Sequence, residues 1–250
     1  MAPAVAVAGR VRQAARFLGA LLVVLAGVPL ALAGRGCSAA RRARITGAWA
    51  RTLLRALGLR LRVGGAQEAG GGGALLVANH VSWLDPLVIA ATVPSKPLAK
   101  REVAGWPIVR TLVAGAGALF IDRERLYALP SAVAAVAGAL RAGDTVVAFP
   151  EGTTWCGRGM GGFRPAVFQA AIDAGATVRP VTLRYREGGE SSTRAGFVGD
   201  DSLLASILRV TATRRLTVEV TLLAPVHPSG ERAALARSVE AQVRAGLMHP

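Results

Sequence analysis

His80 and Asp85 are separated by four residues in the run Asn-His-Val-Ser-Trp-Leu-Asp, which spans positions 79–85. On a single helix or a single strand, this spacing would point the two side chains apart, so a turn must bring them together. If Asp85 accepts a hydrogen bond from one ring nitrogen of His80, the other nitrogen can take a proton from a substrate hydroxyl. The pair therefore predicts a general base without a protein nucleophile. The sequence has no Gly-x-Ser-x-Gly motif, which argues against a serine hydrolase.

The residues on either side of the pair predict the required turn. The apolar run 74–78 is typical of a buried strand, and Pro86 followed by apolar residues begins a helix. His80 would then lie just after the carboxyl end of a strand, where α/β sheets form their binding crevice. Asp85 before Pro86 also fits an ordinary helix N-cap, and the Asp-Pro pair alone favours that interpretation. The position of His80 just after a buried strand favours a catalytic role for this histidine.

Other polar segments follow, or lie within, further predicted strands. Strand 119–121 is followed by Asp122 and Arg123, strand 145–149 leads into the run Pro-Glu-Gly-Thr-Thr at 150–154, and strand 178–185 contains Pro180. Strands are also expected at 59–63 and 216–223, and helices at 45–57, 130–141, 165–174 and 231–246. Residues 186–213 are expected to form a polar loop with a short helix around 202–209. This alternation predicts an α/β fold.

Four of these segments together resemble the glycerolipid acyltransferase family: residues 79–85, 117–123, 149–153 and 178–181 occur in the family's order. The resemblance covers roughly residues 46–245, an ordinary length for one domain. It implies a glycerol-3-phosphate acyltransferase-like mixed sheet flanked by helices, with an N-terminal membrane-associated helical segment. It also implies transfer of a fatty acyl group from a thioester to the free hydroxyl of a lysolipid. The simplest acceptor is 1-acylglycerol-3-phosphate, which would become phosphatidate.

The resemblance assigns roles to individual residues. His80 would act as the general base and Asp85 would orient it. Arg123 would bind the phosphate of the acceptor, because a guanidinium can contact two phosphate oxygens at once. An exposed arginine at a strand end is the alternative for Arg123. Lys100 would either reach the anionic substrate or be a solvated surface lysine.

The third block, Glu151-Gly152-Thr153, is expected to bind substrate. Glu151 would orient an arginine or accept a hydrogen bond from a glycerol hydroxyl, and backbone N–H groups around Gly152 are candidates for stabilising an oxyanion. Pro180 is expected to shape the acyl pocket, although an ordinary core strand explains it almost as well.

Thr154 departs from the family pattern, in which an arginine that counts among the phosphate ligands often follows the Glu-Gly-Thr run. Either Arg158 or Arg164 substitutes for that arginine, or the acceptor carries a different head group, as in a lyso-ornithine lipid or another lysolipid. A membrane lipid-binding protein that keeps the fold without catalysis is the alternative from another functional class. The presence of both His80 and Asp85 argues against it.

The amino-acid composition limits the classes of molecule that the protein is expected to bind. The formal net charge of +15 and the isoelectric point near 11.6 come almost entirely from arginine, which favours anionic partners. Basic runs interleaved with aromatic residues and nucleic-acid-binding motifs are absent from the sequence, so a lipid surface and phosphorylated substrates are expected rather than nucleic acid. Cys37 and Cys156 fit neither a disulfide framework nor a metal-ligand spacing. No metal and no bound cofactor are expected, because acyl-CoA or acyl carrier protein would serve as a substrate.

The N-terminal region, residues 1–45, is expected to be a basic and apolar membrane-associated segment ahead of an acyltransferase domain at 46–250. Residues 17–33 are apolar without interruption, which reaches only the lower limit for crossing a bilayer. Arginines flank both ends, and by the positive-inside rule both ends are drawn to the cytoplasm. A shallow or re-entrant insertion with a kink at Pro29 is therefore expected, rather than a crossing or a cleaved signal peptide. The expected location is the cytoplasmic face of the cell membrane.

Overall fold

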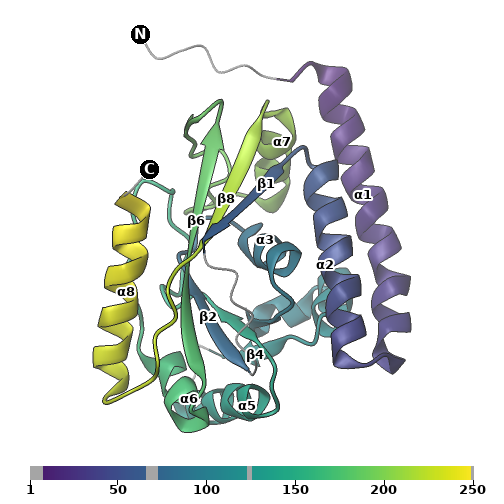
Figure 1. The fold of residues 1–250 in the computed structure, drawn as a ribbon. Coiled ribbons are helices and arrows are strands. Elements are labelled where there is room, and N and C mark those ends of the chain that lie inside the picture. The colour runs from purple at the N-terminus through teal and green to yellow at the C-terminus, as the bar shows by residue number, and fades with distance from the viewer. Residues whose placement is uncertain (1–7, 66–72, 123–125, 249–250) are drawn as a thin grey trace.

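The structure, a computed structural model, describes residues 8–65, 73–122 and 126–248. Within these ranges one eight-stranded sheet has the order β1-β8-β6-β2-β5-β3-β4, with β7 paired to β6 (Figure 1). The strands are β1 (Arg60–Gly65), β2 (Ala74–Ala78), β3 (Lys96–Lys100), β4 (Leu119–Ile121), β5 (Val146–Ala148), β6 (Thr177–Glu187), β7 (Glu190–Ser191) and β8 (Leu216–Leu222). This confirms the predicted mixed α/β fold.

The parallel part of the sheet brings the ends of several strands to one edge. β2 pairs in parallel with both β5 and β6, and β3 pairs in parallel with β5 and β4. Val77 is level with Ala148 on one side and with Pro180 on the other. The residues that follow β2 and β5 therefore emerge next to each other. β8 runs antiparallel to β6 and completes the mixed sheet.

Helices cover both faces of the sheet, which explains why β2 is a continuous apolar run. Leu76 and Ala78 point into one buried cluster, and Leu75 and Val77 point into another, as the alternation of side chains along a strand requires. The first cluster includes residues of α2 (Ala39–Ala56), α3 (Asp85–Thr92) and α7 (Leu203–Ala212). The second includes residues of α5 (Leu129–Arg141), α6 (Ala166–Ala174) and α8 (Arg232–Met248). Figure 1 shows α8 and α2 on opposite sides of the sheet.

The N-terminal helix α1 (Arg10–Ala33) packs alongside the domain. A 3₁₀ turn at Gly34–Gly36 leads from it into α2, and α1 also contacts α4 (Pro107–Gly115) and α7. The indole of Trp49 donates a hydrogen bond to the carbonyl of Val23 over 2.8 Å. A Cβ at Gly27 would lie 2.5 Å from that indole nitrogen, so only glycine allows this approach. At the other end of α1, Arg16 donates to the carbonyls of Thr211 and Thr213 at the end of α7.

The helix continues through Pro29, the position of the expected kink. The segment Arg10–Gly36 is long and apolar enough to cross a membrane, and 17% of its most apolar window is buried against the protein. Among the described residues, this is the single helix that is long and apolar enough to cross a membrane.

The structure differs from the sequence predictions in a few boundaries. α2 begins at Ala39 rather than at residue 45, because the side chain of Ser38 caps it by accepting a hydrogen bond from the backbone of Arg41. The proposed division between residues 45 and 46 therefore lies within α2, and that division stays a prediction. β6 extends to Glu187 and turns through Gly188 and Gly189 into β7, which the sequence analysis did not predict. The sequence also predicts a flexible connection at the glycine cluster 70–73, and most of that cluster lies outside the described residues.

Two of the other connecting segments contain the 3₁₀ turns Arg101–Gly105 and Leu126–Ala128. Gly175 ends α6 in the left-handed conformation, as predicted for that position.

Candidate active site

The carboxylate of Asp85 organises the turn that follows β2. Its Oδ2 accepts hydrogen bonds from the backbone N–H groups of Val81 and Ser82 at 2.6 and 2.8 Å, and Nδ1 of His80 lies 2.8 Å from the same oxygen. Asp85 is the first residue of α3 rather than the residue before it, and it is fully buried. It therefore shapes the turn and also contacts the histidine, so the two interpretations of this residue are compatible.

Tyr185 supplies a further hydrogen bond that the sequence analysis missed. Its hydroxyl donates to Oδ1 of Asp85 over 2.6 Å from β6. Burial, followed by the charge of Asp85, raises the pKa of Tyr185 well above its usual value, so the hydroxyl stays protonated and keeps donating. Strand alternation from Val181 would have placed Tyr185 on the same face of the sheet, but no local signal connects it to residue 85.

The ring of His80 is fixed on two sides. It stacks on Phe149 with ring centroids 4.4 Å apart, and Nδ1 faces Asp85. Because a carboxylate can only accept, Nδ1 of the neutral imidazole carries the hydrogen and Nε2 is left as an acceptor. The His80 side chain is 19% exposed, whereas that of Asp85 is 0% exposed. The arrangement can accept a proton from a hydroxyl that approaches the exposed side.

The loop after β5 holds the backbone of His80. Glu151 accepts hydrogen bonds from the N–H of His80 at 2.6 Å and from the N–H of Gly161 at 2.7 Å, one with each carboxylate oxygen. The N–H of Trp155 donates to the carbonyl of His80 over 2.8 Å. Burial is the main cause that raises the pKa of Glu151, and the two backbone hydrogen bonds oppose it. The structure thus gives Glu151 a positioning contact, and the predicted substrate contact stays a prediction.

Asn79 joins β2 to β6 where their backbone pairing ends. Its side-chain amide donates to the carbonyl of Leu183 at 3.0 Å and accepts from the N–H of Leu183 at 2.8 Å. The residue is buried, and these two hydrogen bonds satisfy the polar atoms of its side chain. Ser82 is also fully buried, and its hydroxyl accepts from the N–H of Leu84, which is not the setting of an exposed nucleophile.

Arg164 lies against Gly152 in the third block. A Cβ added to Gly152 would be 3.1 Å from Cζ of Arg164, and Gly152 has a positive φ of 79°. Thr154 does not take the place of an arginine, because its hydroxyl donates to the carbonyl of Phe197. Arg158 and Arg164 are the two candidates to replace the family arginine that is absent at position 154. Arg164 is therefore the one that packs against the third block.

Backbone contacts limit the expected oxyanion site. The N–H of Gly152 donates to the carbonyl of Phe149 over 3.2 Å, so this group is engaged within its own turn. Thr153 is exposed.

The remaining predicted residues lie at different places. Lys100 is the exposed last residue of β3, at the same edge of the sheet as His80. Pro180 is buried in the middle of β6, on the same face as Val178, which packs in the layer of α5, α6 and α8. Arg123 lies outside the described residues. Within the part of the chain that the structure describes, no group of three or more His, Cys, Asp or Glu side chains is arranged to hold a metal ion.

Comparison with known proteins identifies the family. The family model described as Acyltransferase matches residues 60–184, from β1 to one residue before Tyr185. The chain is 38% identical to a lyso-ornithine lipid O-acyltransferase from Pseudomonas aeruginosa, over 82% of this chain and 79% of that protein. It is 36% identical to a 1-acyl-sn-glycerol-3-phosphate acyltransferase from Neisseria gonorrhoeae, over 84% of this chain and 83% of that protein.

A solved structure has the same fold. The crystal structure of the 1-acyl-sn-glycerophosphate acyltransferase from Thermotoga maritima aligns with a TM-score of 0.73 at 18% identity, over 95% of this chain and 94% of that one. The sequence matches carry the assignment beyond the fold. The chain belongs to the acyltransferase family.

Proposed function

We propose that the protein transfers a fatty acyl group from a thioester to the free hydroxyl of a lysolipid with an anionic head group. The observation that carries the proposal is the contact of 2.8 Å between Nδ1 of His80 and Oδ2 of Asp85, in a histidine whose side chain is partly exposed. Relatives that act on 1-acyl-sn-glycerol-3-phosphate and on lyso-ornithine lipid support a lysolipid acceptor.

The chemistry follows from the tautomer of His80. Nε2 takes the proton of the acceptor hydroxyl while the hydroxyl oxygen attacks the thioester carbonyl carbon. The tetrahedral intermediate then expels the thiolate, which takes the proton from His80, and an ester and a free thiol are released. Asp85 stabilises the imidazolium that exists between these steps. A general base of this kind contributes about 10² to 10⁴ in rate, so positioning of both substrates supplies much of the remainder.

The phosphate-binding roles are part of the proposal. Arg123 would bind an acceptor phosphate, and Arg164 beside Gly152 would supply the second cation in place of the arginine absent at Thr154. Lys100 at the end of β3 would contribute a third positive charge at this edge. The acceptor from this assignment is 1-acylglycerol-3-phosphate, and lyso-ornithine lipid is the second candidate. Pro180 would line the acyl pocket.

The donor would be acyl-CoA or acyl carrier protein loaded with an acyl chain. Both release a thiol, and neither is a resident cofactor. Acyl carrier protein would be a protein partner of this basic chain, because opposite charges favour association.

The apolar helix α1 and the family relationship together indicate association with a membrane. We assign the contact to the leucines of α1 that stay exposed, among them Leu18, Leu22 and Leu25. The arginines on both sides of the helix would contact anionic head groups, each contributing about 1 kcal/mol near such a surface. Arginines at both ends favour the cytoplasmic face, because the positive-inside rule draws both ends to that side.

The test is an assay of the purified full chain in detergent with a panel of lysolipids and both classes of thioester donor. Thiol release and acylated lipid are measured together, so hydrolysis of the donor is distinguished from transfer. Equal amounts of thiol and of acylated lipid support the proposal. Lipid binding without product from any donor and acceptor pair would instead identify a lipid-binding protein with this fold.

A further inference from the structure

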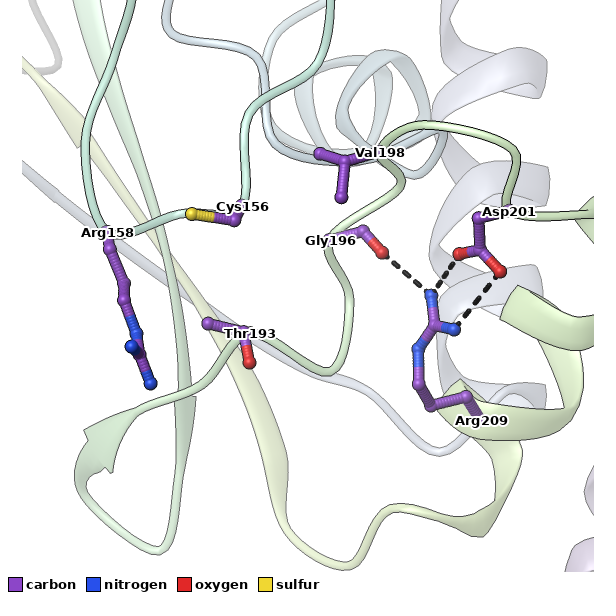
Figure 2. Close-up of a pocket in the computed structure, with 7 residues that line it drawn as sticks. All are labelled: Cys156, Arg158, Thr193, Gly196, Val198, Asp201 and Arg209. Carbon is purple, nitrogen blue, oxygen red and sulfur yellow. Dashed lines mark hydrogen bonds and ion pairs between the residues drawn. The ribbon is translucent and has the colours of Figure 1, made fainter.

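A cavity of about 520 Å³ lies between two loops beside the candidate active site (Figure 2). Its lining residues come from the loop after β5, from the segment between β7 and α7, and from α7 itself: Cys156, Arg158, Thr193, Gly196, Val198, Asp201 and Arg209. The predicted roles of the site residues do not involve this cavity, apart from Arg158 as an alternative for the position of Thr154.

Both loops are attached to the turn that carries His80. The N–H of Trp155 donates to the carbonyl of His80 at 2.8 Å, and the N–H of Phe197 donates to the carbonyl of Val81 at 3.1 Å. The hydroxyl of Thr154 donates to the carbonyl of Phe197 and joins the two loops. A Cβ at Gly157 would lie 3.3 Å from Cγ1 of Val81, so the loop packs directly on the residue after His80. The cavity is therefore held in a fixed relation to the proposed base.

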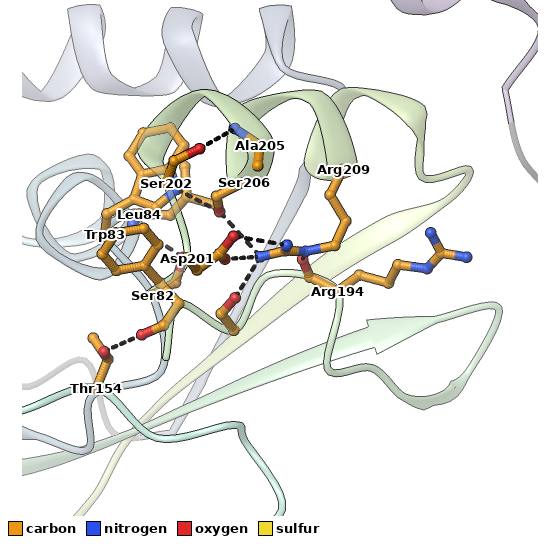
Figure 3. Close-up of polar contacts among 12 residues, drawn as sticks. Ser82, Trp83, Leu84, Thr154, Arg194, Asp201, Ser202, Ala205, Ser206 and Arg209 are labelled. Atoms are coloured by element: carbon orange, nitrogen blue, oxygen red, sulfur yellow. Dashed lines mark hydrogen bonds and ion pairs between the residues drawn. The ribbon is translucent and has the colours of Figure 1, made fainter. Parts of the chain in front are cut away.

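One of the two arginines in the cavity is already engaged by the protein. Nε of Arg209 donates to the carbonyl of Arg194 at 2.9 Å, and its terminal nitrogens donate to the carbonyl of Gly196 at 2.7 Å and to both carboxylate oxygens of Asp201. Figure 3 shows the contacts of this guanidinium with Asp201 and with the hydroxyl of the α7 residue Ser206. Arg209 therefore builds the cavity wall, and its charge is balanced by Asp201.

The other arginine is open to a ligand. Arg158 is exposed, and its side chain makes no hydrogen bond or ion pair with any residue in the described ranges. Figure 2 places it on the opposite side of Thr193 from Arg209. The cavity thus offers one unpaired guanidinium, the hydroxyl of Thr193 and the neutralised pair of Asp201 with Arg209.

We infer that this cavity binds the polar head of the second candidate acceptor, a lysolipid whose head carries a carboxylate and an ammonium group, and that Arg158 holds the carboxylate. A phosphate monoester would instead be held by Arg123 and Arg164, as proposed above. The inference rests on the proposed function, since it names the acceptor of the same reaction. A planar carboxylate carries one negative charge and matches one guanidinium in a two-pronged contact. A phosphate monoester carries close to two negative charges at neutral pH and calls for more than one free cation.

The second charge of such a head group also fits the cavity. Asp201 leaves lone pairs that can accept from an ammonium group, although Arg209 already balances its charge. A lysolipid with an amino-acid head, such as a lyso-ornithine lipid, has this combination of charges.

The experiment compares three acceptors at a saturating thioester donor: lyso-ornithine lipid, the same lipid with its carboxyl group converted to a carboxamide, and 1-acylglycerol-3-phosphate. The variants are Arg158→Gln, which removes the charge, and Arg158→Lys, which keeps the charge but removes the fork. Arg237→Gln on the exposed face of α8 is the matched control. Initial rates give kcat/KM for each acceptor and for the donor, and the melting temperature of each variant monitors folding.

The wild type is expected to prefer lyso-ornithine lipid over its carboxamide by at least about tenfold in kcat/KM. Arg158→Gln should remove that preference by raising KM for the carboxylate, with about threefold or less change for 1-acylglycerol-3-phosphate, and Arg158→Lys should be intermediate. A wild type that acylates lysolipids without discriminating the carboxamide overturns the inference and leaves the proposed function standing. An Arg158→Gln effect confined to the thioester donor also overturns it, by assigning the cavity to the donor. A wild type inactive on all three acceptors overturns the proposed function itself.

Discussion

Asp85 is the residue on which the proposed chemistry most depends. A buried carboxylate is costly unless its oxygens are satisfied, and here His80, Val81, Ser82 and Tyr185 all contact it. Two of these contacts are backbone N–H groups of the turn, so the charge that orients the histidine also stabilises the turn that presents it. A change at Asp85 therefore alters local folding and chemistry together, which makes it a poor probe of either.

Tyr185 permits a test of the buried network through pH. The pKa of Tyr185 is higher in the folded protein than in the unfolded protein. Its contribution to stability is therefore complete at pH values below the unfolded pKa, and it is lost as the pH rises through the folded pKa. Tyr185→Phe should therefore lower the free energy of unfolding by about 1.5–3 kcal/mol near neutral pH, through loss of the bond to the charged Asp85.

The difference from wild type should stay constant up to about pH 10 and then shrink by as much as about 1.4 kcal/mol per pH unit. Urea unfolding of the detergent-solubilised protein between about pH 7 and about pH 11 measures it. A difference that is unchanged or larger at the highest pH would show that Tyr185 is not held protonated by its surroundings.

A substitution at Glu151 tests whether the third block positions the backbone of His80. In Glu151→Gln one amide oxygen can still accept, but the amide nitrogen would face either the N–H of His80 or the N–H of Gly161. We expect the free energy of unfolding to fall by about 1–3 kcal/mol and kcat to fall, with a smaller change in KM for either substrate. Denaturant unfolding and initial rates measure these effects. Glu190→Gln on the exposed strand β7 is the control, and an equal effect in both variants would remove the positioning role.

The sequence predicted the parts of the site that are local in the chain. His80 and Asp85 are five residues apart, so turn geometry alone brought them together. Tyr185 and Asn79 make their contacts across sequence separations of 100 and 104 residues, which depend on the strand order β6-β2. A single sequence carries no signal for such a pairing. For the same reason it could not show that Glu151 accepts from the backbone of His80.

At the scale of elements, periodicity and buried runs predicted most strands and helices. β2 and β4 begin and end as expected, because each is a short apolar run bounded by turn residues. The start of α2 differs from the prediction, because Ser38 caps the helix and the arginines at 41, 42 and 44 lie within its first turns rather than in a flank of the membrane segment. β7 is a two-residue strand created by the hairpin after β6, and it is too short to produce a sequence pattern.

α1 has two different faces. One side packs on α2, α4 and α7, and the approach at Gly27 ties it closely to Trp49. The other side leaves Leu18, Leu22 and Leu25 exposed by 56%, 67% and 48%. These spacings of four and three residues place the leucines on one stripe of the helix. The stripe is therefore available to a lipid surface while the helix stays packed on the domain.

A triple variant, Leu18→Ser with Leu22→Ser and Leu25→Ser, tests that stripe. A leucine contributes about 1.5–3 kcal/mol when fully buried, so partial insertion of three should make the wild type bind vesicles at least about a hundredfold more tightly than the variant. Sedimentation with vesicles in low and high salt measures this. Wild type should stay bound in high salt, because apolar contacts are not screened as ionic ones are. Met248→Ser at the exposed end of α8 is the control, and a triple variant that binds as tightly as wild type would exclude the stripe as the contact.

At the scale of the whole molecule, the fold combines the apolar helix α1 with a sheet edge that carries His80, Asp85 and Glu151. The net charge of +15 attracts anionic surfaces and anionic substrates alike. The helices α1 and α2 lie on the same side of the sheet as α3, which begins with Asp85 (Figure 1). A lysolipid in the bilayer and a thioester from solution would therefore meet at the sheet edge, where β2 and β5 end.

Acyl transfer by His80 is the central claim, and the turnover of His80→Ala tests it most directly. The full chain in detergent would be assayed for thiol release and acylated lipid, beside wild type and His227→Ala, a histidine outside the candidate site. Loss of the base should lower kcat by about 10² to 10⁴. Vesicle binding and melting temperature should stay close to those of wild type, because the side chain of His80 is partly exposed rather than in the core. His227→Ala should keep wild-type turnover. Undiminished transfer by a folded His80→Ala protein would contradict the account.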